Sequence, residues 1–254
     1  MNKFGLNYEF HKSKNPQAKT MVFLHGLTGN TKRWTTYVND LKNDNNLILI
    51  DLIGHGQSDF PDDLKDFSPQ SQAEKIENLI KDLNTKNITL VSHSYSYTIA
   101  LEILQRKKIR IARFIMISPF FTEKKEETFK KTVLKILIKT WPILKHKRKS
   151  KEFAYPQKNK HPSFHDHKES IENIGIKSYL AHLHFCLNPK LDREITFKIP
   201  SLLIYKENDK LFSQQIHSKI KKFFINLKEY KILGQGHLFL IENKDEIIKA
   251  IKSF

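Results

Sequence analysis

The sequence predicts an α/β fold with a doubly wound, mostly parallel sheet. Six short apolar runs recur along the 254-residue chain, and several are hydrophobic almost throughout, as strands buried on both faces of a sheet must be. Segments with apolar residues at helical spacing lie between these runs. Such an alternation of strands and helices is typical of a parallel sheet that is covered by helices on both faces.

Each apolar run and each amphipathic segment defines an expected element. The expected strands, in chain order, are TMVFLHG, NLILIDLIG, ITLVSHS, RFIMISPF, IPSLLIYKEND and YKILGQGH. The expected helices are Lys32 to Leu41, Gln70 to Leu83, Tyr95 to Arg106, Ser213 to Phe224 and Lys244 to Phe254. No Gly/Ser linker divides the chain, so we expect one domain with an insertion.

The insertion follows RFIMISPF, where residues 121–198 are too many for a crossover loop. We expect a core made of residues 1–120 and 199–254, and a helical lid made of residues 121–198 over the carboxyl edge of the sheet. The stretch from Thr122 to Lys168 holds fourteen Lys/Arg and five Asp/Glu. The apolar residues of TVLKILIKTWPIL, which include Trp141, are expected to pack on the core; lining an acyl pocket or lying on a membrane are the alternatives.

The composition indicates which kinds of binding partner and which cellular location to expect. The net charge of +17 favours anionic partners, although an A/T-biased genome would also enrich lysine. The N-terminus lacks an apolar h-region and no eighteen apolar residues run together, so neither a standard signal peptide nor a transmembrane anchor is expected. The single cysteine, Cys186, suits a reducing, cytoplasmic location and is expected to be a small buried hydrophobe.

The stretch ITLVSHSYSYTIA places Ser94 between an expected strand and an expected helix. A sharp bend there would raise the Ser94 hydroxyl above the sheet and aim a helix N-terminus at developing negative charge. The usual pattern for such a bend is G-x-S-x-G, but here Ser92 and Ser96 stand at the glycine positions. Ser94 is therefore a candidate nucleophile, and a serine-rich turn is the alternative.

Three further segments supply the other groups that serine hydrolysis needs. HGLTG follows a strand, and the amide of Leu27 could join that of Tyr95 to bind an oxyanion. His237, in GQGHLFLIE, is the candidate base because Gly234 and Gly236 form a turn after the last strand. Asp209, in YKENDKLF, is the candidate orienting acid at the end of the penultimate strand.

The remaining polar clusters are assigned to structure. Glu207 is a weaker candidate than Asp209 for the orienting acid because it lies nearer the strand. In DLIGHGQSDF, Asp51, His55 and Asp59 are assigned to loop architecture, since no nucleophile accompanies them. The ligand-type histidines of HPSFHDH have no established geometry, so no metal site and no cofactor are expected; they are His161, His165 and His167.

Taken together, these motifs resemble a small, capped serine hydrolase of the α/β-hydrolase fold. HGLTG resembles that family's oxyanion loop, DLIGHGQSD its D-x-x-G-H-G-x-S motif, VSHSYS its nucleophile elbow, KEND its acid turn and GQGH its histidine loop. The resemblance runs from about Met21 to Phe254 apart from the lid, which falls after the family's sixth strand. It departs from the family at the two elbow glycines and at Lys206, where the acid turn usually has a glycine.

The resemblance implies that Ser94 is the nucleophile, His237 the general base, Asp209 the orienting acid, and Leu27 and Tyr95 the oxyanion donors. A serine in place of a carboxylate nucleophile disfavours the family's dehalogenase and epoxide hydrolase branches. We also expect His25, Phe120 and Trp141 to contact the substrate.

The leading functional hypothesis is a hydrolase of carboxylic esters or thioesters that works through an acyl-enzyme. The basic lid suggests an anionic substrate, an acidic carrier or a lipid surface, and similarity to pimeloyl-acyl carrier protein methyl ester esterases is one specific candidate. Lipases, thioesterases, carbon-carbon hydrolases and the lyase of the menaquinone precursor share the same triad. A hydrolase-like binding or regulatory protein is the alternative from another class, and nucleic-acid binding is disfavoured because no such motif is present.

Overall fold

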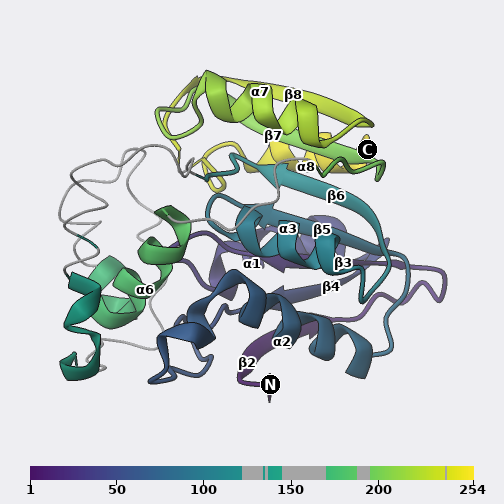
Figure 1. Ribbon diagram of the computed structural model, residues 1–254. Helices are drawn as coiled ribbons and strands as arrows, with labels where there is room; N and C mark the ends of the chain where they lie inside the picture. Colours follow the sequence, from purple (N-terminus) through teal and green to yellow (C-terminus); the bar gives the residue numbers. More distant parts are fainter. Residues whose placement is uncertain (122–133, 135–136, 145–169, 188–194, 238) are drawn as a thin grey trace.

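The computed structural model describes residues 1–121, 134, 137–144, 170–187, 195–237 and 239–254. Within these residues the fold is built on one eight-stranded sheet (Figure 1). Its strands are β1 (Asn2–Lys3), β2 (Leu6–His11), β3 (Lys19–Leu24), β4 (Asn45–Ile50), β5 (Ile88–His93), β6 (Ile111–Ile117), β7 (Ser201–Asn208) and β8 (Leu227–Gln235). They lie in the order β1-β2-β4-β3-β5-β6-β7-β8, and β3 to β8 are parallel. The expected mostly parallel, doubly wound sheet is confirmed.

The sequence did not predict β1 and β2. Strand β2 pairs antiparallel with β4, with Tyr8 opposite Ile50 and His11 opposite Leu47. In β2 only Leu6 and Tyr8 are fully buried, and polar residues alternate with them. An antiparallel strand near the edge of a sheet needs only one buried face, so it lacks the continuous apolar run that marks the parallel strands.

Helices cover both faces of the sheet. One face carries α2 (Pro69–Asp82), α3 (Ser96–Arg106) and α7 (Gln214–Phe223), and the other carries α1 (Thr35–Leu41) and α8 (Lys244–Lys252). Helix α2 starts where the Ser68 hydroxyl accepts a hydrogen bond from the Ser71 amide, with Pro69 in its first turn. These five helices match the expected ones to within a few residues.

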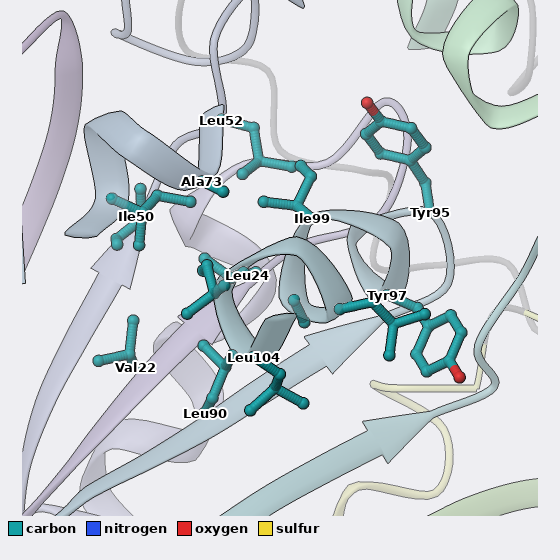
Figure 2. Close-up of a cluster of buried hydrophobic side chains, with 14 of the residues drawn as sticks. Val22, Leu24, Ile50, Leu52, Ala73, Leu90, Tyr95, Tyr97, Ile99 and Leu104 are labelled. Atoms are coloured by element: carbon teal, nitrogen blue, oxygen red, sulfur yellow. The ribbon is translucent and has the colours of Figure 1, made fainter. Parts of the chain in front are cut away.

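Two buried clusters hold the helices on the sheet. The larger lies under α2, α3 and α7 and contains Val22, Leu24, Ile50, Leu90 and Ile99 (Figure 2). The other lies under α1 and α8. Because Tyr95 and Tyr97 at the start of α3 are fully buried in the larger cluster, the junction between β5 and α3 is fixed by packing.

The chain between β6 and β7 is described only in part. Helix α6 (Ile176–Leu187) and a short 3₁₀ helix (Trp141–Ile143) belong to it, and Figure 1 shows α6 beside one end of the sheet. Of the expected apolar stripe, Leu134 and Trp141 are buried and Leu137 is exposed. Val133, Ile136 and most of the basic stretch from Thr122 to Lys168 lie outside the described residues, as do the histidines of HPSFHDH.

Two smaller expectations concern Cys186 and membrane spans. Cys186 is buried in α6, where burial raises the pKa of its thiol to about 12, so it behaves as a small hydrophobe as expected. Among the described residues, no helix has both the length and the apolarity to cross a membrane.

Candidate active site

A sharp turn between β5 and α3 holds Ser94. Its φ angle is +53°, a left-handed conformation that costs energy for any residue other than glycine. The end of β6 and the residues after it fix this turn: the Ser94 amide donates to the Ile117 carbonyl at 3.0 Å, and the Ser94 carbonyl accepts from the Phe120 amide at 3.2 Å. The turn thus leaves the Ser94 side chain partly exposed at the carboxyl edge of the sheet.

Ser96 fastens the turn although glycine usually stands at its position. Its Oγ accepts a hydrogen bond from the His93 amide at 3.0 Å and lies 3.0 Å from the carbonyls of both Leu24 and His93. The hydroxyl therefore connects the end of β3 with the start of the turn. Ser92 is different, since its Oγ is fully buried and has no hydrogen-bond partner among the described residues.

Replacement of these two serines by alanine should have different effects on stability. Ser96→Ala removes the acceptor of the His93 amide and is expected to lower the free energy of unfolding by about 1–3 kcal/mol. Ser92→Ala removes a buried hydroxyl that has no partner, so stability should stay the same or rise. Urea unfolding of both variants measures the difference, and an equal loss in both would contradict the assigned role of Ser96.

His237 lies between Ser94 and Asp209. Its Nε2 is 2.7 Å from Ser94 Oγ, and its Nδ1 is 2.7 Å from Asp209 Oδ2. A carboxylate can only accept, so Nδ1 carries the proton and Nε2 is free to accept the proton of the Ser94 hydroxyl. The structure thus brings together three predicted side chains that are far apart in the sequence.

The turn after β7 holds Asp209 in its ionised form. Its side chain is fully buried, and its Oδ1 accepts hydrogen bonds from the amides of Leu211 at 2.9 Å and Phe212 at 3.3 Å. Burial alone would raise the pKa of this carboxyl, but the bond and charge of His237 and the Leu211 amide outweigh burial and lower the pKa. Asp209 therefore stays charged and can orient His237.

The HGLTG loop lies directly beside the turn. A Cβ atom added to Gly26 would lie 2.8 Å from His93 Nδ1 and 3.3 Å from Ser94 Cβ, so only glycine fits there. Among the described residues, the amides of Leu27 and Tyr95 donate to no acceptor. Tyr95 also begins the first turn of α3, where unpaired amides attract negative charge.

His25 sets the direction of the Leu27 amide. The Leu52 amide donates to His25 Nε2 at 3.0 Å, so His25 Nδ1 carries the proton and donates to the Gly26 carbonyl at 2.8 Å. A trans peptide points its N–H away from its C=O, which turns the Leu27 amide away from His25. We expected His25 to contact substrate; that expectation is wrong, because His25 is fully buried and both its ring nitrogens are occupied.

His25 belongs to a buried group of histidine rings that joins the core to α6. The His55 ring lies 4.9 Å from that of His25 and 4.5 Å from that of His182 on α6, and the His182 ring lies 5.2 Å from that of Tyr95. The Thr28 amide donates to His55 Nε2 at 3.2 Å. The motif that contains His55 therefore supports the HGLTG loop, as its assignment to loop architecture predicted.

Burial keeps these rings neutral. Desolvation lowers the pKa of His25 to about 3 and that of His182 to about 4, and it lowers the pKa values of His55 and His93 well below their usual range. A neutral histidine offers one donor and one acceptor, which is the state in which His25 and His55 hold the loop.

Because the buried histidines stay neutral, we expect the protein to lose stability in mild acid. In the unfolded chain these histidines take up protons near pH 6.5, whereas in the folded chain they stay neutral at lower pH. The contribution of these histidines to the free energy of unfolding is therefore fully present above pH 6.5. It falls as the pH drops toward 5, by up to about 1.4 kcal/mol per pH unit for each histidine. Urea unfolding between pH 7.5 and 5 checks this, and His182→Phe should have a shallower dependence; identical slopes would contradict the prediction.

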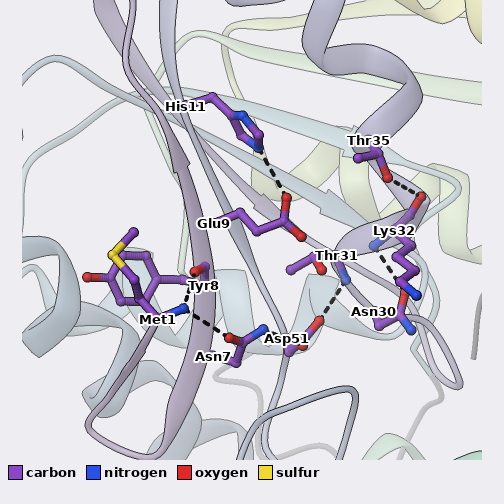
Figure 3. Close-up of polar contacts among 10 residues, drawn as sticks. All are labelled: Met1, Asn7, Tyr8, Glu9, His11, Asn30, Thr31, Lys32, Thr35 and Asp51. Carbon is purple, nitrogen blue, oxygen red and sulfur yellow. Dashed lines mark hydrogen bonds and ion pairs between the residues drawn. The ribbon is translucent and has the colours of Figure 1, made fainter. Parts of the chain in front are cut away.

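Asp51 anchors the loop after β4. Its Oδ1 accepts from the Thr31 amide at 2.6 Å (Figure 3), and its Oδ2 accepts from Asn7 Nδ2 at 2.8 Å and the Gln57 amide at 2.9 Å. Burial raises the pKa of Asp51 against these bonds. A Cβ atom on Gly56 would lie 2.1 Å from the same carboxylate, so the glycine is needed for this approach. Asp51 thus acts in loop structure, as expected.

Phe120 and Trp141 occupy different places. Phe120 follows β6, is partly buried and contacts Ser94 through its backbone amide, so a contact with substrate stays a prediction for it. Trp141 is buried against the core: its Nε1 donates to the Asp62 carbonyl at 2.7 Å, and its ring packs edge-on against Phe67 with the centroids 5.5 Å apart. Trp141 therefore attaches the segment after β6 to the core.

Sequence reasoning missed the role of His93. Its buried ring stacks on the His237 ring with the centroids 5.6 Å apart. Ser118 was missed as well; its hydroxyl lies near the Asp209 carboxylate and favours the charged form. Neither residue carries a sequence signal beyond its position at the end of a strand.

Comparison with known proteins identifies the fold. The family described as alpha/beta hydrolase fold matches residues 19–137. A Bacillus megaterium epoxide hydrolase superposes with a TM-score of 0.74 at 18% identity, covering 100% of this chain and 98% of the other. The esterase from Thermogutta terrifontis superposes with a TM-score of 0.74 at 16% identity, covering 98% and 92%. The chain has the α/β-hydrolase fold.

Curated relatives of this α/β-hydrolase-fold protein differ in their named activities. A putative esterase/lipase of Haemophilus influenzae is 25% identical over 268 residues, which cover 100% of this chain and 89% of that protein. Epoxide hydrolase 3 of Xenopus tropicalis is 25% identical over 114 residues, but the match spans 45% of this chain and 31% of that protein. The fold is therefore shared across several kinds of hydrolase.

Proposed function

We propose that this protein is a serine hydrolase that cleaves carboxylic esters through an acyl-enzyme. The observation that carries the proposal is the continuous set of hydrogen bonds from Asp209 through His237 to Ser94, with both distances 2.7 Å. A serine hydroxyl is a weak nucleophile until a positioned base removes its proton, and His237 lies in place to do so.

The steps follow from the positions of these groups. Ser94 Oγ attacks the ester carbonyl while His237 Nε2 takes its proton, and the charge that forms on His237 is stabilised by Asp209. The amides of Leu27 and Tyr95 bind the oxyanion. His237 then protonates the leaving alcohol and activates the water that releases the acid. Loss of one oxyanion donor would cost about 3 kcal/mol of transition-state stabilisation.

The type of nucleophile distinguishes the proposed activity from those of some relatives. Epoxide hydrolases and haloalkane dehalogenases of this fold use a carboxylate as the nucleophile, whereas position 94 is serine. The second hypothesis, a hydrolase-like binding protein, was based on the missing elbow glycines. Ser96 accounts for one of them by binding the turn directly, and this weakens that hypothesis.

The substrate part of the proposal rests on charge. With a net charge of +17, the protein should favour anionic esters or acyl groups on an acidic carrier, of which a pimeloyl-acyl carrier protein methyl ester is one example. A thioester or an anionic lipid surface is compatible with the same charge. A cytoplasmic location is part of the proposal, since a chain with a single cysteine cannot form an intramolecular disulfide and suits a reducing compartment.

Labelling with a fluorophosphonate tests the proposed nucleophile. One phosphonyl group per chain should attach to Ser94, located by mass spectrometry of the peptides, and prior labelling should abolish hydrolysis of p-nitrophenyl esters from acetate to octanoate. A protein that neither reacts with the probe nor hydrolyses any of these esters would overturn the proposal in favour of a binding function.

A further inference from the structure

Lys206 is a buried lysine at the carboxyl end of β7. Only 3% of its side chain is exposed, and its Nζ lies 3.4 Å from Glu242 Oε2. The same amine lies 5.8 Å from the centroid of the Phe239 ring. Burying an ammonium group is costly unless a partner compensates the charge, so these contacts must be maintained for the folded state to tolerate Lys206.

The contacts of Lys206 lie on both sides of His237. Before His237, a Cβ atom on Gly234 would lie 3.1 Å from Lys206 Cε, so the lysine stem runs against this part of the backbone. After His237, the amine contacts Phe239 and Glu242. Gly236, between these contacts, has a φ angle of +101° and no atom near its Cβ position. The glycine residues leave the backbone of the segment that carries His237 flexible, so its position depends on the contacts with Lys206.

Lys206 also shapes the turn that carries Asp209. The Asp209 amide donates to the Lys206 carbonyl at 3.3 Å, and the pairing of β7 with β8 shifts register between Lys206 and Asn208. Such irregularities commonly redirect a side chain next to an active site. One residue thus contacts both segments that must meet for His237 Nδ1 to reach Asp209.

We propose that Lys206 is a positioning residue: its bond to Glu242 holds the His237 segment against the Asp209 turn. This inference rests on the proposed function and extends it to a residue that touches neither substrate nor the reacting atoms. Because a displacement of about 1 Å can cost on the order of 100-fold in rate, loss of this contact should act on the chemical step rather than on substrate binding.

The variant Lys206→Met keeps the stem and removes the charge. We expect kcat for p-nitrophenyl butyrate to fall by about 10-fold to 100-fold with little change in KM. Glu242→Gln, at an exposed position, should also lower kcat. The double variant should be no worse than Lys206→Met alone, because both changes break the same contact. The control is the exposed pair Lys231 and Glu207, which joins β8 to β7 at 2.9 Å; Lys231→Met should leave kcat unchanged.

A second readout separates positioning from a general loss of structure. The proton shared by His237 Nδ1 and Asp209 should give a low-field resonance in proton NMR spectra, and it should broaden or vanish in Lys206→Met while the melting temperature and the remaining spectrum show a folded protein. Unchanged kcat with an intact resonance would overturn the inference. If the wild type lacks turnover and does not label at Ser94, the proposed function fails, and the resonance alone still tests the role of Lys206.

Discussion

Replacing Ser94 by alanine is expected to reduce kcat for p-nitrophenyl esters by about 10⁶-fold, to a residual rate set by the oxyanion donors and binding alone. The hydroxyl is the only group lost, because alanine and serine share the Cβ that the left-handed backbone at φ +53° must accommodate. Steady-state kinetics and fluorophosphonate labelling of the variant measure the effect, and the melting temperature should change little.

The control for Ser94→Ala is Ser92→Ala, two residues away on the same segment. Ser92 has a buried hydroxyl that contacts no described hydrogen-bond partner, so this variant should keep both activity and labelling. If Ser94→Ala retained more than about one hundredth of the wild-type kcat, the nucleophile would have to be sought elsewhere.

Asp209→Asn is expected to lower kcat by about 10⁴-fold with little change in fold. Asp209 Oδ1 accepts from the amides of Leu211 and Phe212, and in the variant the amide oxygen of asparagine would take this place. Its NH₂ group would then face His237 Nδ1. His237 would have to accept there and carry its proton on Nε2, the nitrogen that must take the proton of Ser94.

The control for Asp209 is Glu207, the weaker candidate for the orienting acid in the sequence. Glu207 is exposed and pairs with Lys231 at 2.9 Å, away from His237. Glu207→Gln should therefore leave kcat unchanged. Full activity in Asp209→Asn, or a large loss in Glu207→Gln, would show that the orienting acid had been assigned incorrectly.

The parallel strands and their helices could be predicted because burial on both faces leaves a continuous apolar run in the sequence. Strand β2 was missed because its polar residues alternate with only two fully buried ones, Leu6 and Tyr8. The positions of Ser94, Asp209 and His237 at strand ends were predicted for a related reason: parallel strands bring their carboxyl ends to one edge.

Contacts between distant segments could not be predicted in the same way. His25 follows a strand that ends at the site, yet the Leu52 amide and the Gly26 carbonyl take both its ring nitrogens and exclude it from substrate. Lys206 occupies a position where the family usually has glycine, and its sequence context does not indicate that it reaches Glu242. Such pairings depend on how loops fold over the sheet edge, which local patterns do not encode.

The closeness of α6 to the core has a consequence for engineering the protein. A Cβ atom on Gly54 would lie 2.2 Å from Ser178 Oγ and 2.6 Å from Phe67. Ser178 of α6 therefore packs against the loop after β4 at a position that has room only for glycine. The fit is thus encoded jointly by a residue of the core and a residue of the inserted segment. A chimera that exchanges the insertion for one from another hydrolase would have to match a small residue at position 178 to Gly54. An insertion chosen without regard to this pair would be displaced from His55 and Tyr95, the core residues that contact His182 of α6.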